Sequence, residues 1–182
     1  MKSNNKYPFK NFSGTVWYIA MEDSDISGFM PLKKINTGFQ TLSVAEVVTL
    51  AARLYAEDAG EAVPAAGSGE AWYMGAYDYC VEEGLFTAGQ VPDSALERPA
   101  TRFEMVDILD RAVPEDEKSP IHDTVTIPDL AQTDSRYDVV ARWYRAGITQ
   151  GDQNGNFNGS SSITRAEPAA ILCRLAGLTE RV

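Results

Sequence analysis

Arg165 stands directly after a threonine that has the pattern of a helix start, and its position suits the binding of an anion. Thr164 precedes Glu167 by three residues. This spacing is a capping box, in which the hydroxyl accepts from the third helical amide and the carboxylate accepts from the amide of the cap. An arginine at the first helical position adds a planar pair of donors to the free amides and the positive end of the helix dipole, which we expect to be available to a ligand. The glycine-rich loop 151–158 lets backbone amides approach a carboxylate or a sugar hydroxyl, so the pattern predicts binding chemistry.

The capping box occurs three times along the chain. Its members are Ser43 and Glu46, Thr101 and Glu104, and Thr164 and Glu167. An arginine follows each cap by ten positions. These arginines are Arg53, Arg111 and Arg174. Because apolar residues recur at helical spacing after each cap, and the caps lie 58 and 63 residues apart, the sequence predicts a tandem repeat of capped helices.

A second predicted helix precedes each capping box. In the last two copies it covers residues 137–146 and about 72–83, and it ends at Gly147 and Gly84, each 17 residues before the capping threonine. Glycine readily takes the left-handed conformation that ends a helix. The repeating unit is therefore predicted to be helix, glycine stop, loop and capped helix.

The first copy has the same order of elements. Trp17 and Tyr18 lead to Gly28, which lies 15 residues before Ser43. Residues 57–70 and 114–128 interrupt the pattern with glycine, proline and charge, so they are predicted to be surface connections. The short segments before two of the first helices, residues 9–12 and 127–130, are predicted to be brief and extended without forming a sheet.

The composition indicates a folded, acidic protein. Of 182 residues, 44% are hydrophobic and 23% are charged, and the formal net charge is −10. Nucleic acid is not expected as a partner, because phosphate binding needs a clustered cationic surface. No apolar run predicts a membrane span or the core of a signal peptide, so we expect a cytoplasmic protein or a piece of a longer exported one. Cys80 and Cys173 are predicted to be small buried thiols.

A glycine–isoleucine turn, a glycine-rich loop and an Ile-Thr-Arg-Ala-Glu helix start follow one another near the end of the chain. These motifs are Gly147-Ile148, residues 151–158 and residues 163–167. Together they resemble the consensus of the S-layer homology (SLH) family. The resemblance extends over residues 7–56, 70–113 and 127–178 as three SLH repeats that together form one SLH domain. The second copy keeps Arg102 but has no glycine-rich loop, and the first has Val44 where the family has arginine.

The resemblance implies a fold and a function. The fold would be mainly α, a pseudo-threefold array of three helix–loop–helix repeats around a central three-helix bundle. The function would be non-covalent anchoring to the bacterial cell wall, by binding an anionic, pyruvylated secondary cell-wall polysaccharide in grooves between adjacent repeats. The protein would be extracellular, associated with the cell wall in an S-layer, and part of a larger surface protein. No enzymatic activity, cofactor or metal is expected.

The expected ligand-binding residues follow the family motif and its loop. They are Arg165, Thr164, Gly151, Asp152, Asn154, Arg102 and Thr101. By this reasoning the third copy is the best-equipped groove and the second is a partial one, whereas the first has lost its charged contact. In each aromatic pair, such as Trp143-Tyr144, one ring is expected in the core and the other in a groove wall.

Several of these residues also have a structural interpretation. Arg102 and Arg165 could pair with nearby carboxylates, and the chain could be a degenerate SLH scaffold that mediates protein–protein assembly at the cell surface without binding glycan. Capping explains the three glutamates, so paired-carboxylate catalysis is not expected. The loop has the alternating oxygens of a calcium site, but Phe157 and Ile163 stand where such a loop needs glycine and glutamate. The arginines ten residues after the caps are expected to be structural.

Overall fold

The computed structural model describes residues 40–182, and the described part is built from helices. The α-helices are α2 (Val44–Ala59), α3 (Met74–Glu82), α4 (Arg102–Ala112), α5 (Tyr137–Arg145) and α6 (Ala166–Leu175). Two short 3-10 helices, η2 (Asp93–Ala95) and η3 (Glu115–Lys118), lie in the connections. Within residues 40–182 there is no strand, only isolated bridges, so the prediction of a mainly α fold is confirmed.

Helices α2 and α4 begin directly after the residues that the sequence predicts as caps. Ser43 Oγ accepts from the Glu46 amide at 3.3 Å, and Glu46 accepts from the Ser43 amide at 2.8 Å. Thr101 and Glu104 make the same reciprocal pair, at 3.2 and 2.9 Å. Caps of this kind typically stabilise a helix by about 1 kcal/mol.

Helix α6 begins differently, and Pro168 gives the physical reason. Glu167 accepts from the Thr164 amide at 2.7 Å, but the Glu167 amide bonds to the Thr164 carbonyl at 3.2 Å, as in a 3-10 turn. Proline has no amide, so the next bond of a regular helix, from residue 168 to the Thr164 carbonyl, is not possible. The first regular helical residue is consequently Ala166, with Arg165 at the N-cap.

Helices α3 and α5 lie before their glycines, as predicted. Gly84 and Gly147 both have left-handed φ values, 72° and 65°. Helix α3 begins at Met74, two residues later than expected, and α2 continues to Ala59, three residues into the segment expected to be a connection. The predictions for the first copy before residue 40, including the extended segment 9–12, the helix at Trp17 and the glycine at Gly28, lie outside the described residues.

The expectation of an extended segment at residues 127–130 is wrong. The chain turns there, and the Leu130 amide donates to the Ile127 carbonyl at 3.2 Å. The turn directs the Asp129 carboxylate at the loop before α6, where it accepts from two backbone amides. Its role is therefore to hold that loop rather than to extend a strand.

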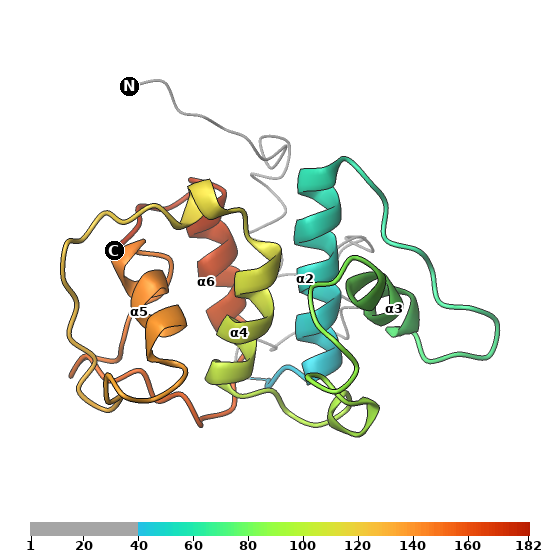
Figure 1. Cartoon of the computed structure of the whole chain (residues 1–182), viewed down its shortest axis with the longest axis horizontal. Coiled ribbons are helices and arrows are strands. Elements are labelled where there is room, and N and C mark those ends of the chain that lie inside the picture. The colour runs from blue at the N-terminus through green and yellow to red at the C-terminus, as the bar shows by residue number, and fades with distance from the viewer. Residues whose placement is uncertain (1–39) are drawn as a thin grey trace.

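A ring of three backbone hydrogen bonds joins the residues before α2, α4 and α6. The Leu42 amide donates to the Ile163 carbonyl at 3.1 Å, the Ile163 amide to the Ala100 carbonyl at 3.0 Å, and the Ala100 amide to the Leu42 carbonyl at 2.8 Å. All three residues are fully buried. The ring ties together the starts of the three capped helices, which Figure 1 shows beside one another with α3 and α5 on the outside. The pseudo-threefold array as a whole stays a prediction.

Apolar packing and one buried polar cluster hold the outer helices in place. Helix α2 packs against α3 and α4, and α4 packs against α5 (Figure 1). Between α4 and α5, the Asp110 carboxylate accepts from Trp143 Nε1 at 2.7 Å and forms an ion pair with Arg142. Lys118 Nζ donates to the Asp110 carbonyl at 2.8 Å. Among residues 40–182, no helix is long and apolar enough to cross a membrane.

Candidate functional site

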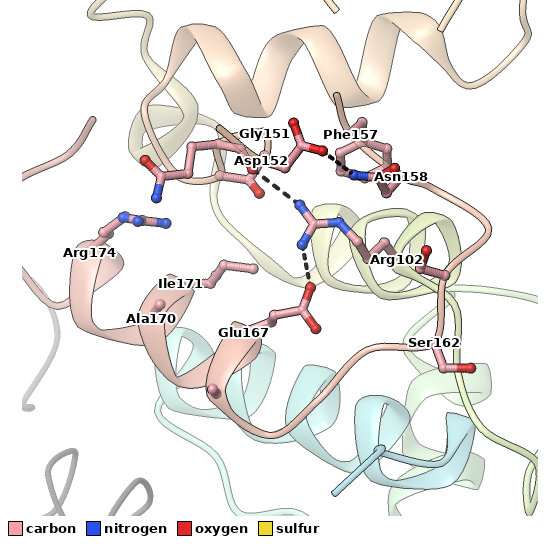
Figure 2. A pocket seen from close by; sticks show the side chains of 14 residues that line it. Arg102, Gly151, Asp152, Phe157, Asn158, Ser162, Glu167, Ala170, Ile171 and Arg174 are labelled. Carbon is pink, nitrogen blue, oxygen red and sulfur yellow. Dashed lines mark hydrogen bonds and ion pairs between the residues drawn. The ribbon is translucent and has the colours of Figure 1, made fainter. Parts of the chain in front are cut away.

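A pocket of about 460 Å³ lies where the start of α4, the loop 149–162 and one face of α6 meet. Figure 2 shows Arg102 entering it from α4, and Glu167, Ala170, Ile171 and Arg174 facing it from α6. The glycine-rich loop forms its remaining wall. The pocket thus combines charged, polar and apolar surfaces from segments that are distant in the sequence.

The glycine-rich loop is folded around the Asp152 carboxylate. Asp152 Oδ1 accepts from the amides of Asn154 and Asn156 at 2.8 and 3.0 Å, and Oδ2 accepts from Asn158 Nδ2 at 3.0 Å. These hydrogen bonds, first among them the one from Asn158, lower the pKa of Asp152 from its ordinary value. A carboxylate surrounded by N–H donors is an organiser of the loop, which differs from the role of a calcium ligand.

Close backbone approach explains the glycine at position 151. A Cβ built there would lie 2.5 Å from the carbonyl carbon and oxygen of Gly155, and Gly155 itself has φ 81°. Asp129 fixes the far end of the loop, since its carboxylate oxygens accept from the Phe157 and Asn158 amides at 2.7 Å each. The loop is therefore shaped by its own sequence and by one carboxylate that precedes α5.

Arg102 is held on three sides. Its Nη1 forms an ion pair with Glu167 of α6, and its Nη2 donates to the Gln150 carbonyl at 3.2 Å (Figure 2). The guanidinium carbon lies 4.8 Å from the centre of the Phe157 ring, within cation–π range. Arg102 therefore lines the pocket but already has partners in it.

Arg174 lies in the last turn of α6 and has a different set of contacts. Its Nη1 donates to the Ile148 carbonyl at 3.0 Å. Arg111, at the same distance from its own cap, donates to the Leu85 carbonyl at 3.2 Å. Leu85 and Ile148 each directly follow a helix-ending glycine, so the same contact fixes the chain after α3 and after α5. This contact fits the structural role expected for these arginines.

Arg165 lies away from the pocket. It is 7% exposed, and its Nη2 forms an ion pair with the capping Glu46 of α2. The two pairs follow one rule, because Arg102 likewise bonds to a capping glutamate of another capped helix, Glu167. Each motif arginine thus links two helix starts.

The amides at the helix starts are also occupied, which corrects the physical argument made from the sequence. The Arg102 and Phe103 amides donate to the Ser161 and Gly159 carbonyls at 3.0 and 2.9 Å, and the Arg165 amide donates to the Gln40 carbonyl at 2.9 Å. We expected these amides to be available to a ligand. The loop before the neighbouring capped helix takes them instead, because it pairs with each helix start.

The structure divides the expected ligand-binding residues into two groups. Three line the pocket: Arg102, Gly151 and Asp152. Four do not, and they are Arg165, Thr164, Asn154 and Thr101. The sequence reasoning did not assign Arg174, Ile171 or Gln150 to a site. The helical spacing of residues 167, 170, 171 and 174, which places them on one face of α6, was the available signal.

An aromatic ring of the pocket lining, that of Phe157, packs against a ring of α5. Trp143 is fully buried, whereas Tyr144 is partly buried and its ring lies 6.1 Å from that of Phe157. Burial raises the pKa of Tyr144 to about 12. On α3's side the pair is reversed, with Trp72 half-exposed and Tyr73 packed against the core.

The pocket-forming loop lies inside a segment that matches a known protein family. Residues 126–169 match the family model of the S-layer homology domain. Among curated proteins, none matches the chain at a significant level. SLH domains are generally cell-wall anchoring modules: they bind cell-wall polymers at the cell surface and are not catalytic. The match covers α5, the glycine-rich loop and the first turn of α6, and it supports the resemblance to this family.

Proposed function

We propose that the protein anchors non-covalently to the bacterial cell wall by binding an anionic, pyruvylated secondary wall polysaccharide in the pocket beside α6. The observation that carries the proposal is that this pocket is formed largely by the segment that matches the SLH domain. In this proposal residues 7–56, 70–113 and 127–178 are three SLH repeats of one domain, within a larger exported surface protein.

The lining of the pocket suits an acidic sugar. Arg102 and Arg174 supply positive charge to a chain whose net charge is −10. Asn158 and the serines at 161 and 162 offer polar groups to sugar hydroxyls. Ala170 and Ile171 offer an apolar surface to the carbon side of a sugar ring or to a methyl group. This mixture of a few polar groups and an apolar wall is typical of ligand sites.

A scaffold without glycan affinity is the second candidate function, and the two motif ion pairs favour it. Arg102 and Arg165 bond to Glu167 and Glu46, so both are already engaged in joining helix starts. At the start of α2, Val44 is buried and brings no charge. A degenerate SLH domain that mediates assembly at the cell surface would need only these joints.

Sedimentation with cell walls separates the two functions. The chain is mixed with protein-free walls of its source, with walls from which the secondary polysaccharide has been extracted, and with walls whose pyruvyl ketals have been removed by mild acid. We expect the protein to sediment with the first preparation and to stay in solution with the other two. Equal sedimentation with all three would contradict recognition of the polysaccharide. A folded protein that stays in solution with all three would favour the scaffold.

A further inference from the structure

The two arginines of the pocket differ in how their charge is balanced. The Arg102 charge is balanced by Glu167, and both Nη atoms have partners, Nη1 in that pair and Nη2 at the Gln150 carbonyl. Within residues 40–182, Arg174 makes one hydrogen bond, to the neutral Ile148 carbonyl, and no ion pair. An anion that enters the pocket therefore finds its electrostatic partner at Arg174.

We propose that Arg174 binds the carboxylate of an acidic sugar, and that Arg102 is a positioning residue that holds the loop and α6 together around it. The inference rests on the proposed function and names the residue that gives the pocket its selectivity for anions. A guanidinium has further N–H donors beside the one that donates to the Ile148 carbonyl, so Arg174 can donate to a carboxylate without giving up that contact. Arg102 differs in its charge rather than in its number of donors: Glu167 already balances it, so it attracts an incoming anion less strongly.

A comparison with α4 supports the assignment. Arg111 makes the same carbonyl contact as Arg174, but it also forms an ion pair with Asp107, four residues earlier, at 2.9 Å. In α6 the residue four positions before Arg174 is Ala170. The carbonyl contact thus does not require an arginine without a carboxylate partner. Of these two arginines, Arg111 has such a partner, and Arg174 has none among residues 40–182.

The environment of Arg174 makes an incoming anion more favourable. Arg174 is partly buried, and the loss of hydration around its guanidinium lowers its pKa from the ordinary value. A charged hydrogen bond in such a place is stronger than one in open water. Asp152, the nearby carboxylate of the loop, directs its oxygens at N–H donors of the loop itself.

The wall beside Arg174 indicates the kind of acid. Ala170 and Ile171 precede it by four and three residues, so their side chains share its face of α6 and line the same pocket (Figure 2). A carboxylate that carries a small apolar group on the neighbouring carbon would place that group on this wall. A pyruvyl ketal, with a carboxylate and a methyl group on one carbon, has this form, whereas a uronic acid does not.

The test uses a soluble glycoside with one pyruvyl ketal, its neutral methyl ester and a glucuronide, each titrated calorimetrically into the whole chain. We expect the ketal to bind, the methyl ester to lose affinity by about tenfold or more, and the glucuronide to bind more weakly than the ketal. Ala170→Asp places a carboxylate where α4 has Asp107, so it should neutralise Arg174 and abolish binding while the thermal unfolding temperature stays close to that of the wild type. Arg174→Gln should weaken binding as strongly.

Arg111→Gln is the matched control, since it alters the equivalent arginine outside the pocket and should leave binding unchanged. The inference is overturned if Ala170→Asp and Arg174→Gln, both folded by circular dichroism, bind the ketal as the wild type does. Wall sedimentation of the same variants distinguishes failure of the Arg174 site from failure of the anchoring function. If the Arg174 variants sediment with walls as the wild type does, the role of Arg174 is ruled out, but the proposed anchoring function still stands. If the ketal binds through Arg174 but the wild type does not sediment with walls, the anchoring function is contradicted and the assignment of the carboxylate site to Arg174 still stands.

Discussion

Two junctions between capped helices use the same backbone contacts but place their charge differently. At the α4–α6 junction, formed by the start of α4 and residues 149–167, the capping Glu167 is bound by Arg102 from the neighbouring helix. At the α2–α4 junction, formed by the start of α2 and residues 86–104, the capping Glu104 is bound by Arg98 from its own segment. The position equivalent to Arg102 holds the buried Val44.

The backbone of the two junctions is equivalent residue by residue. The Val44 and Ala45 amides donate to the Arg98 and Leu96 carbonyls at 3.0 and 2.8 Å. These carbonyls stand three and five residues before the cap, as Ser161 and Gly159 do at the other junction. The same backbone hydrogen bonds therefore form at both junctions, although the side chains differ: Val44 and Ala45 at one, Arg102 and Phe103 at the other.

Moving the arginine changes what the junction offers to a ligand. Arg102 is largely buried, with 15% of its side chain exposed, and it stands between a helix and a loop. The Arg98 side chain is 47% exposed, and it satisfies Glu104 from the solvent side. At each of these junctions the capping glutamate is paired with a cation, and the source of that cation decides whether it also lines the pocket.

The largest expected effects come from the residue five positions before each cap, because both junctions are tightly packed there. Leu96 is 1% exposed, so Leu96→Ala should lower the free energy of unfolding by about 2–5 kcal/mol through the cavity it leaves. At Gly159 a Cβ would lie 2.1 Å from the Phe103 ring, so Gly159→Ala should cost about 1–3 kcal/mol through overpacking. Urea unfolding followed by circular dichroism measures both.

A control distinguishes these packing effects from general sensitivity of the loops. Gly89→Ala changes an exposed glycine of the loop before α4, where the nearest atom to a new Cβ is Thr87 Oγ1 at 3.8 Å, and it should change stability little. If Gly159→Ala is as well tolerated as Gly89→Ala, the close contact with Phe103 does not constrain the α4–α6 junction.

A smaller effect should distinguish the two ion pairs themselves. Double-mutant cycles with arginine to alanine and glutamate to glutamine give the coupling energy of each pair without the cost of each single change. We expect about 1–2 kcal/mol for Arg102–Glu167, which is mostly buried, and about 0.5 kcal/mol for Arg98–Glu104, which is more exposed. A coupling of Arg98–Glu104 equal to or larger than the other would contradict the view that burial separates the two junctions.

Local rules explain why much of this fold could be predicted from the sequence. A capping box and a glycine stop depend on residues a few positions apart, so Ser43, Thr101, Gly84 and Gly147 indicate helix ends without knowledge of the tertiary structure. Pro168 belongs to the same class, since its missing amide explains why α6 starts late. The turn at Asp129 was missed because its partners, the amides of the loop, lie 28 and 29 residues away.

The site was harder to predict because it depends on which side chains meet across helices. Arg165 and Arg102 are equivalent in the sequence, yet one binds Glu46, 119 residues away, and the other lines a pocket. In the sequence Arg174 is one of three arginines at the same distance from a cap, with Arg53 and Arg111. Arg174 differs from Arg111 in the residue four positions earlier, which is Ala170 instead of an aspartate. This difference points to a binding site only once the pocket is known.

The smallest expected effect is a shift in the titration of Glu104, which reports directly on the exposed cation of the α2–α4 junction. The side-chain hydrogen bonds from Arg98 lower the pKa of Glu104 to about 2. Because the folded-state pKa lies below the unfolded value of 4.5, this contribution to stability is present above pH 4.5 and is lost as the pH falls toward 2.

Arg98→Ala should raise the pKa of Glu104 toward its ordinary value, although the cap bonds with Thr101 still hold it somewhat lower. Carboxyl carbon shifts followed by NMR between pH 2 and 6 measure this. With exposure screening the pair, the accompanying loss of stability near neutral pH should stay below about 1 kcal/mol. An unchanged titration of Glu104 in the variant would mean that the cap alone depresses its pKa. Arg98 would then not take the place of the motif arginine, whose position in α2 is occupied by Val44.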